Sequence, residues 1–152
     1  MITPDVTEAM EKYGFPGMKV LLFAFSGDFE THPYNPDNFI EDCVAYTGTH
    51  DNNTIKGWYQ HDATEEEKEH LETCLDMKIK VAHLHWDLIE VLLASKAAVI
   101  LIPIQDVLGL GAEARMNRPG TPHGNWHWRL LADQIKPHIV KKLLSLTKET
   151  QR

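Results

Sequence analysis

Apolar runs limit what this chain can fold into. Met18–Phe25 reads MKVLLFAF, Ala97–Ile104 reads AAVILIPI, and a shorter run, CVAYT, lies between them at Cys43–Thr47. A run without alternating polar positions must be covered on both faces, which is typical of a parallel strand flanked by helices. We therefore predict strands at about residues 18–25, 43–47 and 97–104.

Helix signals alternate with these strands. A proline at the first helical position and a Thr-x-x-Glu capping box both mark helix starts, and apolar residues at helical spacing mark the helix bodies. The predicted helices begin at Thr3-Pro4-Asp5, at the capping box of Thr64 and Glu67, at Val81 and near Trp126, and Lys136-Pro137 interrupts the last one.

This alternation predicts an α/β fold in a single domain over residues 1–152. Two architectures remain open on the pattern alone, a small doubly wound sheet or a segment of a (β/α) barrel. Both bind ligands at the carboxyl ends of the strands. Long polar loops follow the first and third strands at Ser26–Phe39 and Gln105–Trp126, and His50-Asp51 follows the second. We expect the functional site there.

Composition narrows the class of ligand and the compartment. A formal charge of −7 argues against nucleic acid, which requires Lys and Arg for its phosphates, and a neutral ligand such as a sugar fits better. No apolar run approaches the roughly 18 residues that span a membrane, so we expect no membrane contact. Cys43 and Cys74 lie far apart and no export signal precedes them, which favours a cytoplasmic protein with reduced thiols.

Other motifs have simpler interpretations. His50-Asp51 has an alternative reading as an ordinary loop pair, with Asp51 capping the following helix. The glycines at Gly109 and Gly111 superficially fit a dinucleotide fingerprint, but no acidic residue follows at about 20 positions, so a tight turn is the better interpretation. No His or Cys spacing predicts a zinc site. We expect no metal and no organic cofactor.

Three stretches in this order and spacing resemble the 4-α-glucanotransferase family, the amylomaltases or disproportionating enzymes. They are GFPGMKVLLFAF at Gly14–Phe25, YTGTHDNNT at Tyr46–Thr54 followed by Gly57-Trp58, and QDVLGLG at Gln105–Gly111 continuing through Glu113, Arg115-Met116-Asn117, Pro119-Gly120 and Asn125-Trp126. Members of this family transfer α-1,4-glucan segments between maltooligosaccharides with retention.

The resemblance implies a (β/α)₈ barrel, which needs about 250 residues. The three strands here would be the sixth, seventh and eighth. Retaining chemistry uses a carboxylate nucleophile and a carboxylic acid about 5–5.5 Å apart. In the family these residues follow the fourth and fifth strands, and the segment that resembles Ile2-Thr3-Pro4 comes just after the second of them. Both would therefore lie outside these 152 residues.

The resemblance also assigns roles within the chain. Asp51 corresponds to the family's third carboxylate, which stabilises the distorted sugar in the transition state. His50 would donate a hydrogen bond to that sugar, and Phe23 resembles an aromatic residue that packs on the glucan. Asn117 matches a polar contact in the last long loop, and Asp28 matches a sugar-binding aspartate across a local length difference.

These assignments lead to competing hypotheses. The chain is expected to be a glucanotransferase fragment that is inactive alone and forms active enzyme with an N-terminal chain. The alternatives are a non-catalytic glucan-binding or structural remnant, or an interrupted reading frame. Because the outer two strands would leave unpaired edges, we also expect self-association or a partner chain.

Overall fold

A computed structural model describes residues 3–152, so Met1 and Ile2, at the start of the predicted domain, lie outside the described residues. Three parallel strands form one sheet in the order β1-β2-β3, with Met18 opposite Val44 and Val44 opposite Val99. The strands are β1 (Gly17–Val20), β2 (Cys43–Tyr46) and β3 (Val99–Leu101). The small parallel sheet with flanking helices confirms the predicted α/β class.

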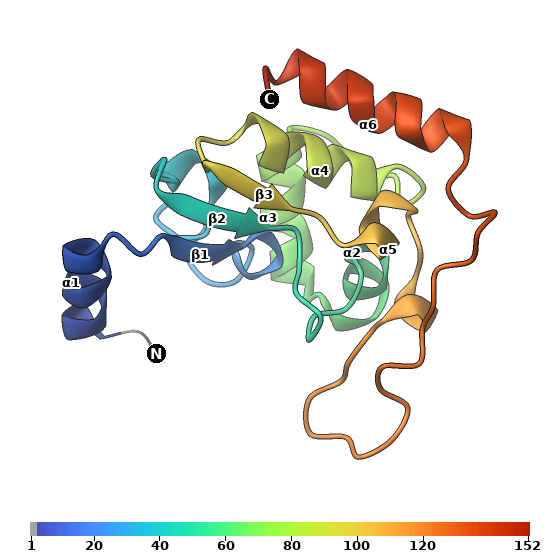
Figure 1. Cartoon of the computed structure of the whole chain (residues 1–152), viewed down its shortest axis with the longest axis horizontal. Helices are drawn as coiled ribbons and strands as arrows, with labels where there is room; N and C mark the ends of the chain where they lie inside the picture. Colours follow the sequence, from blue (N-terminus) through green and yellow to red (C-terminus); the bar gives the residue numbers. More distant parts are fainter. Residues whose placement is uncertain (1–2) are drawn as a thin grey trace.

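The helices are α1 (Pro4–Tyr13), α2 (Ile55–Gly57), α3 (Glu65–Leu75), α4 (Leu84–Ala94), α5 (Ile104–Val107) and α6 (Pro137–Glu149). A π-helical turn, η3 (Trp58–Asp62), continues α2, and the 3₁₀ turns are η1 (Leu21–Phe23), η2 (Pro36–Asn38) and η4 (Ala112–Ala114). Figure 1 shows α1 standing apart from the sheet and α6 lying along α4.

Two of the predicted strands are too long. β1 ends at Val20, where the predicted strand continued to residue 25, because the apolar run goes on into the buried 3₁₀ turn η1. β3 begins at Val99 and ends at Leu101, whereas the predicted strand spanned residues 97–104, and Ile104 already starts α5. A continuous apolar run therefore locates a strand but does not show how far its extended backbone continues. The prediction for β2 is confirmed at Cys43–Tyr46.

Two of the predicted helix starts are confirmed, whereas α4 begins at Leu84 instead of Val81 and the fourth predicted start is wrong. α1 begins at Pro4, and the capping box of Thr64 and Glu67 is present in full. The predicted helix near Trp126 is wrong, because the chain stays irregular until α6 begins at Pro137. Lys136-Pro137 is a helix start and not an interruption, since the fixed φ of proline suits the first helical position and its missing N–H is not needed there.

The hydrophobic core lies on one side of the sheet. Leu84, Leu88 and Leu92 of α4 pack with Leu71 of α3 against β2. Along β2, the side chains of Cys43 and Ala45 point to this covered face, so Val44 and Tyr46 point to the other. The register puts Met18, Val99 and Leu101 on that second face, where all three are exposed. We call these three residues with Val44 and Tyr46 the open face.

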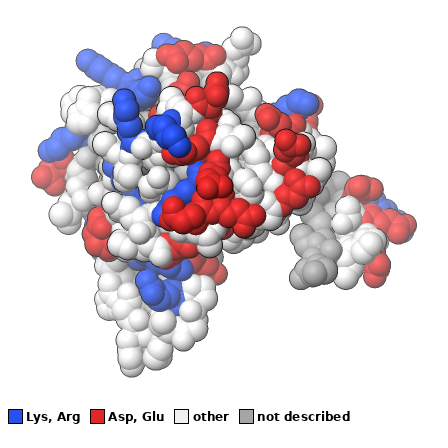
Figure 2. Space-filling model, turned by 180° about the vertical axis from the view of Figure 1, so that it is seen from behind, with Lys and Arg blue, Asp and Glu red and all other residues white. Residues whose placement is uncertain are grey.

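Charged side chains are distributed over the outside of the molecule. Figure 2 shows acidic side chains gathered on the rear face, with basic ones interspersed among them. Among residues 3–152, no helix combines the length and the hydropathy that crossing a membrane requires.

Candidate functional site

His50 and Asp51 lie at the tip of a tight turn that follows β2. The amide of Asn52 donates to the carbonyl of Thr49, and the Asn52 side chain accepts from the Thr49 amide and hydroxyl at 2.9 and 2.8 Å. Thr54 is the N-cap of α2 and accepts from the amide of Gly57 at 3.0 Å. The alternative that Asp51 caps this helix is therefore wrong, and its carboxylate remains available at the turn.

The Asp51 carboxylate contacts the loop after β3. Asn117 Nδ2 donates to Asp51 Oδ1 at 2.6 Å, and His50 Nε2 lies 3.3 Å from the same oxygen. The amide of Asn117 also donates to the carbonyl of His50 at 3.0 Å. Both side chains of the His50-Asp51 pair are about half exposed. The structure thus brings together three of the residues selected from the sequence, from two separate loops.

Arg115 fastens this arrangement from the side. Its Nη2 donates to the carbonyl of Asp51 at 2.7 Å and its Nε donates to the carbonyl of Asn117 at 2.8 Å. Its Nη1 lies 3.5 Å from Asp62 Oδ2, which also accepts from Asn53 Nδ2 at 3.0 Å. One largely buried guanidinium therefore joins the turn after β2, the loop after β3 and the π-helical turn η3. Its fixed fork of donors suits such a three-way contact.

Trp126 is held in an unusual conformation beside His50. Its φ is +64°, a left-handed conformation that a bulky residue rarely adopts. Its amide donates to the carbonyl of Met116 at 2.7 Å. This hydrogen bond closes the base of the loop of residues 117–125, which we call the protruding loop. The indole lies 5.2 Å from the His50 ring, centre to centre, and Trp126 is 52% exposed. Backbone strain of this kind clusters at functional sites.

Asp106 lies beneath the turn and is almost wholly buried, at 2% exposure. Thr47 Oγ1 donates to one carboxylate oxygen at 2.7 Å, and the amide of Ile55 donates to the other at 2.8 Å. Burial raises the pKa of Asp106 to about 6, and the two hydrogen bonds partly oppose this rise. Among the described residues, no ion pair reaches this carboxylate.

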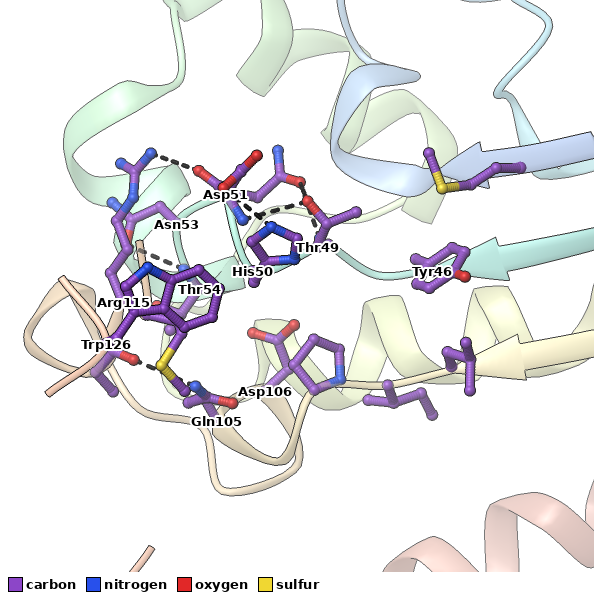
Figure 3. A pocket seen from close by; sticks show the side chains of 18 residues that line it. Tyr46, Thr49, His50, Asp51, Asn53, Thr54, Gln105, Asp106, Arg115 and Trp126 are labelled. Atoms are coloured by element: carbon purple, nitrogen blue, oxygen red, sulfur yellow. Dashed lines mark hydrogen bonds and ion pairs between the residues drawn. The ribbon is translucent and has the colours of Figure 1, made fainter. Parts of the chain in front are cut away.

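A cavity of about 640 Å³ opens at this end of the sheet, within the usual range for small-molecule sites. It is lined by Tyr46 and Leu101 of the open face and by residues of the turn after β2 and of the loop after β3. Figure 3 shows Asp51, His50 and Trp126 on one side of this space and Asp106 below them. Asp51 and Asp106 are the only carboxylates among its described lining residues.

Two residues selected from the sequence lie elsewhere. Phe23 stands on η1, is 47% exposed and stacks on Tyr34 with ring centres 6.2 Å apart. Asp28 lies in the loop after β1, where its carboxylate accepts from the hydroxyl of Thr31 at 2.9 Å. Neither lines the cavity around Asp51. The sequence argument also missed Asp106, Arg115 and Trp126 as site residues, although each lies in a stretch that it had selected.

The site has the parts of a carbohydrate pocket. The carboxylate of Asp51, the imidazole of His50 and the exposed indole of Trp126 line a cavity whose surface is largely apolar. Between residues 3 and 152, no three His, Cys, Asp or Glu side chains come together as a metal site. The fold and this cavity define an α/β protein with a pocket at the carboxyl ends of its parallel strands, the place where such folds bind ligands.

Comparison with known proteins identifies the family. A family model described as 4-alpha-glucanotransferase matches residues 1–134. The chain belongs to the 4-alpha-glucanotransferase family. It is 42% identical to the 4-alpha-glucanotransferase of Thermus thermophilus over all of this chain and 31% of that protein. It is 45% identical to the chloroplastic/amyloplastic 4-alpha-glucanotransferase of Solanum tuberosum, over 86% of this chain and 22% of that one.

Solved structures agree with this assignment. The amylomaltase from Streptococcus agalactiae in complex with acarbose is similar over all of this chain and 30% of its own length, with a TM-score of 0.92 and 30% identity. The amylomaltase from Corynebacterium glutamicum is similar in fold, with a TM-score of 0.58 and 18% identity over 83% of this chain. The chain thus spans about a third or less of the length of the relatives it matches. It corresponds to the C-terminal portion of an amylomaltase.

Proposed function

We propose that this chain supplies the transition-state-stabilising carboxylate, Asp51, to a 4-α-glucanotransferase that moves α-1,4-glucan segments between maltooligosaccharides. Family membership supports the substrate class. The observation that carries the residue assignment is the geometry around Asp51. This carboxylate is half exposed at the rim of the cavity and is oriented by Asn117 and His50.

The proposed role follows from the chemistry of retaining transfer. The transition state resembles an oxocarbenium ion, and hydrogen bonds to ring hydroxyls strengthen as it forms. A carboxylate held at the right place accepts those hydrogen bonds without reorganisation, so it lowers the barrier more than it tightens substrate binding. The contacts of Asn117 and Arg115 with Asp51 hold it in this way.

Neighbouring residues take supporting roles. His50 donates a hydrogen bond to the same sugar, and Asn117 contacts the glucan from the loop after β3. Trp126, exposed beside His50, offers an aromatic face for a sugar ring. Phe23 and Asp28 lie outside the cavity, and we propose that they contact glucan units further along the chain, with Phe23 supported by its stacking on Tyr34.

The nucleophile and the acid/base are proposed to come from another part of the enzyme. Retaining transfer needs two carboxyl groups facing one bond. The described cavity is lined by only two carboxylates, and Asp106 is buried with both oxygens already hydrogen-bonded. These residues alone are therefore expected to be inactive. The open face would become the interior of a (β/α)₈ barrel, where side chains from alternate strands pack in layers.

The test is complementation. The chain is co-expressed with the part of a 4-alpha-glucanotransferase that it does not cover, and disproportionation of maltotriose is measured. Asp51→Asn is expected to lower kcat by roughly 10³-fold, as for removal of other preorganised transition-state contacts. The matched control is Asp133→Asn, an exposed aspartate outside the cavity. Normal turnover by the Asp51→Asn complex would refute the assignment of Asp51.

A non-catalytic glucan-binding role is the second candidate. It is favoured by the cavity, whose described lining has an exposed aromatic residue and, apart from the buried Asp106, a single carboxylate. It predicts that acarbose or maltotetraose binds the chain in calorimetry and that no mixture gives turnover. Turnover in the complemented enzyme would eliminate it.

A further inference from the structure

Asp106 joins the two ends of the turn that carries His50 and Asp51. Its carboxylate accepts from the hydroxyl of Thr47, directly after β2, and from the amide of Ile55, the first residue of α2. Asp106 itself lies in α5, which follows β3. The side chain of Asp106, from the helix that follows β3, therefore links the two residues that flank a seven-residue turn, Thr47 and Ile55.

A carboxylate is a costly choice at this position. Burial disfavours its charged form, and among the described residues no Lys or Arg forms an ion pair with it. The nearby guanidinium of Arg115 is committed to the carbonyls of Asp51 and Asn117 and to Asp62. Buried acids of this kind in a cleft are candidates for functional roles.

The shape of the group explains what it does. The two oxygens of a carboxylate accept from two donors at once in a fixed planar geometry, so Thr47 and Ile55 are held at a set separation. Fixing both ends restricts the positions available to the turn residues between them. Arg115 also holds the tip of the turn, because it donates to the carbonyl of Asp51.

We propose that Asp106 is a positioning residue that sets the orientation of the His50-Asp51 turn toward the glucan, acting through Thr47 and Ile55. The inference rests on the proposed function of Asp51. A misplacement of about 1 Å in such a group can lower turnover by about 10²-fold without abolishing substrate binding. Asp106 touches no reacting atom in this scheme.

The first test measures the turn directly in the 152-residue chain by amide hydrogen exchange. Asp106→Ala is expected to speed exchange at residues 50–55 by about 10-fold or more, because it leaves both donors without their acceptor. Asp106→Asn, which keeps an acceptor for Ile55, should stay within about 3-fold of the parent. The control is Asp87→Ala on α4, a partly buried carboxylate outside the cavity. Unchanged exchange in Asp106→Ala would overturn the proposal.

The second test separates positioning from a general structural role. In the complemented enzyme, Asp106→Ala is expected to lower kcat by about 10²-fold while KM changes by less than about 3-fold. Asp106→Asn should recover most of that loss, and Thr47→Val, which removes one of the two donors, should fall between them. Equal kcat in Asp106→Ala and Asp87→Ala would overturn the proposal even if exchange had changed.

The two proposals fail in distinguishable ways. If the complemented parent shows no turnover, the proposed function fails. Amide exchange in the 152-residue chain then decides the inference, with residues 50–55 of Asp106→Ala expected to exchange about 10-fold faster than those of the parent and of Asp87→Ala. Equal exchange in all three proteins would overturn it.

Discussion

The carboxyl ends of the strands and the open face of the sheet differ in how far contacts within this chain cover or pair their side chains. At the carboxyl ends of the strands, each exposed site residue is tied to a neighbour, as Asp51 is to Asn117 and to Arg115. On the open face, Met18, Val99 and Leu101 leave apolar surface exposed to water. The polar side chains at the strand ends are paired within the chain, whereas the open face exposes apolar side chains as one half of an interface would.

The difference supports the proposed function, in which this chain supplies one carboxylate and another part of the enzyme covers the open face. Polar contacts within the chain hold Asp51 in place, as its proposed role as a supporting carboxylate requires. The apolar area, whose burial stabilises by about 25 cal/mol per Å², is left to be covered by something else. We therefore expect substitutions on the open face to affect association with the rest of the enzyme. Substitutions around Asp51 should affect turnover and local stability.

The largest expected effect is on assembly. Val99→Lys places a charge on the open face, on the outer strand β3, and burying an unpaired ammonium against another part of the enzyme is costly. Association with the complementing part of the enzyme is expected to weaken by about 10²- to 10³-fold, measured by surface-immobilised binding or by titration of restored turnover.

The control is Leu144→Lys on α6, which is 52% exposed, similar to Val99 at 47%. It should bind as the parent does, and both variants should keep the unfolding free energy of the isolated chain within about 0.5 kcal/mol. Equal weakening by the two lysines would remove the special status of the open face.

The next effect is on stability beneath the site. Gly109 has φ +62°, and a Cβ there would lie 2.6 Å from Nε2 of the buried His85 ring. Gly109→Ala is therefore expected to cost about 2–4 kcal/mol of unfolding free energy in urea titrations. Gly120→Ala, on the protruding loop, has φ +78° but meets nothing within 4 Å. It should cost only about 1 kcal/mol, and equal losses would contradict the packing argument.

A third prediction concerns pH. The folded pKa of Asp106, about 6, exceeds its ordinary value of 3.8, so the folded chain keeps a proton that the unfolded chain releases between these values. The stability that this proton provides is present at low pH and is lost as pH rises through about 6. Relative to the parent, Asp106→Asn should gain on the order of 1–3 kcal/mol between pH 4 and pH 7.5, since one pKa unit corresponds to about 1.4 kcal/mol.

The measurement is the urea midpoint of both proteins across this range, with Asp133→Asn as a control whose difference from the parent stays flat. A difference between Asp106→Asn and the parent that does not change with pH would show that this carboxyl has no raised pKa in the fold.

The smallest effect on stability is expected at Asn117. Its hydrogen bond with Asp51 is exposed, so Asn117→Ala should change the unfolding free energy by less than about 0.5 kcal/mol. The same change frees the Asp51 carboxylate and should weaken acarbose binding by about 10-fold in calorimetry. A large loss of stability with unchanged binding would reverse the proposed roles of this contact.

Local signals predicted some of the fold and missed other parts for physical reasons. The capping box at Thr64 and the second strand at Cys43 were readable, because the residues that form them are neighbours in sequence. The first strand was overextended, because Leu21 and Leu22 are buried in a 3₁₀ turn that looks the same as a strand in an apolar pattern.

The site divides in the same way. His50, Asp51 and Asn117 were found because they stand in family motifs, and the structure adds that they touch. Asp106 was missed, because its partner Thr47 is 59 residues away and no local pattern encodes that hydrogen bond. Its place in the QDVLGLG stretch, shortly after the predicted third strand, was a signal that could have found it.

The central claim is that Asp51 lies on this chain and the nucleophile and acid/base on another part of the enzyme. A mixing experiment on maltotriose tests it most directly. Product formation is measured for this chain alone, for the complementing part of a 4-alpha-glucanotransferase alone, and for the two together. The account predicts glucose and longer maltooligosaccharides only from the mixture. Disproportionation by this chain alone would contradict it, because a complete catalytic pair would then lie within these 152 residues.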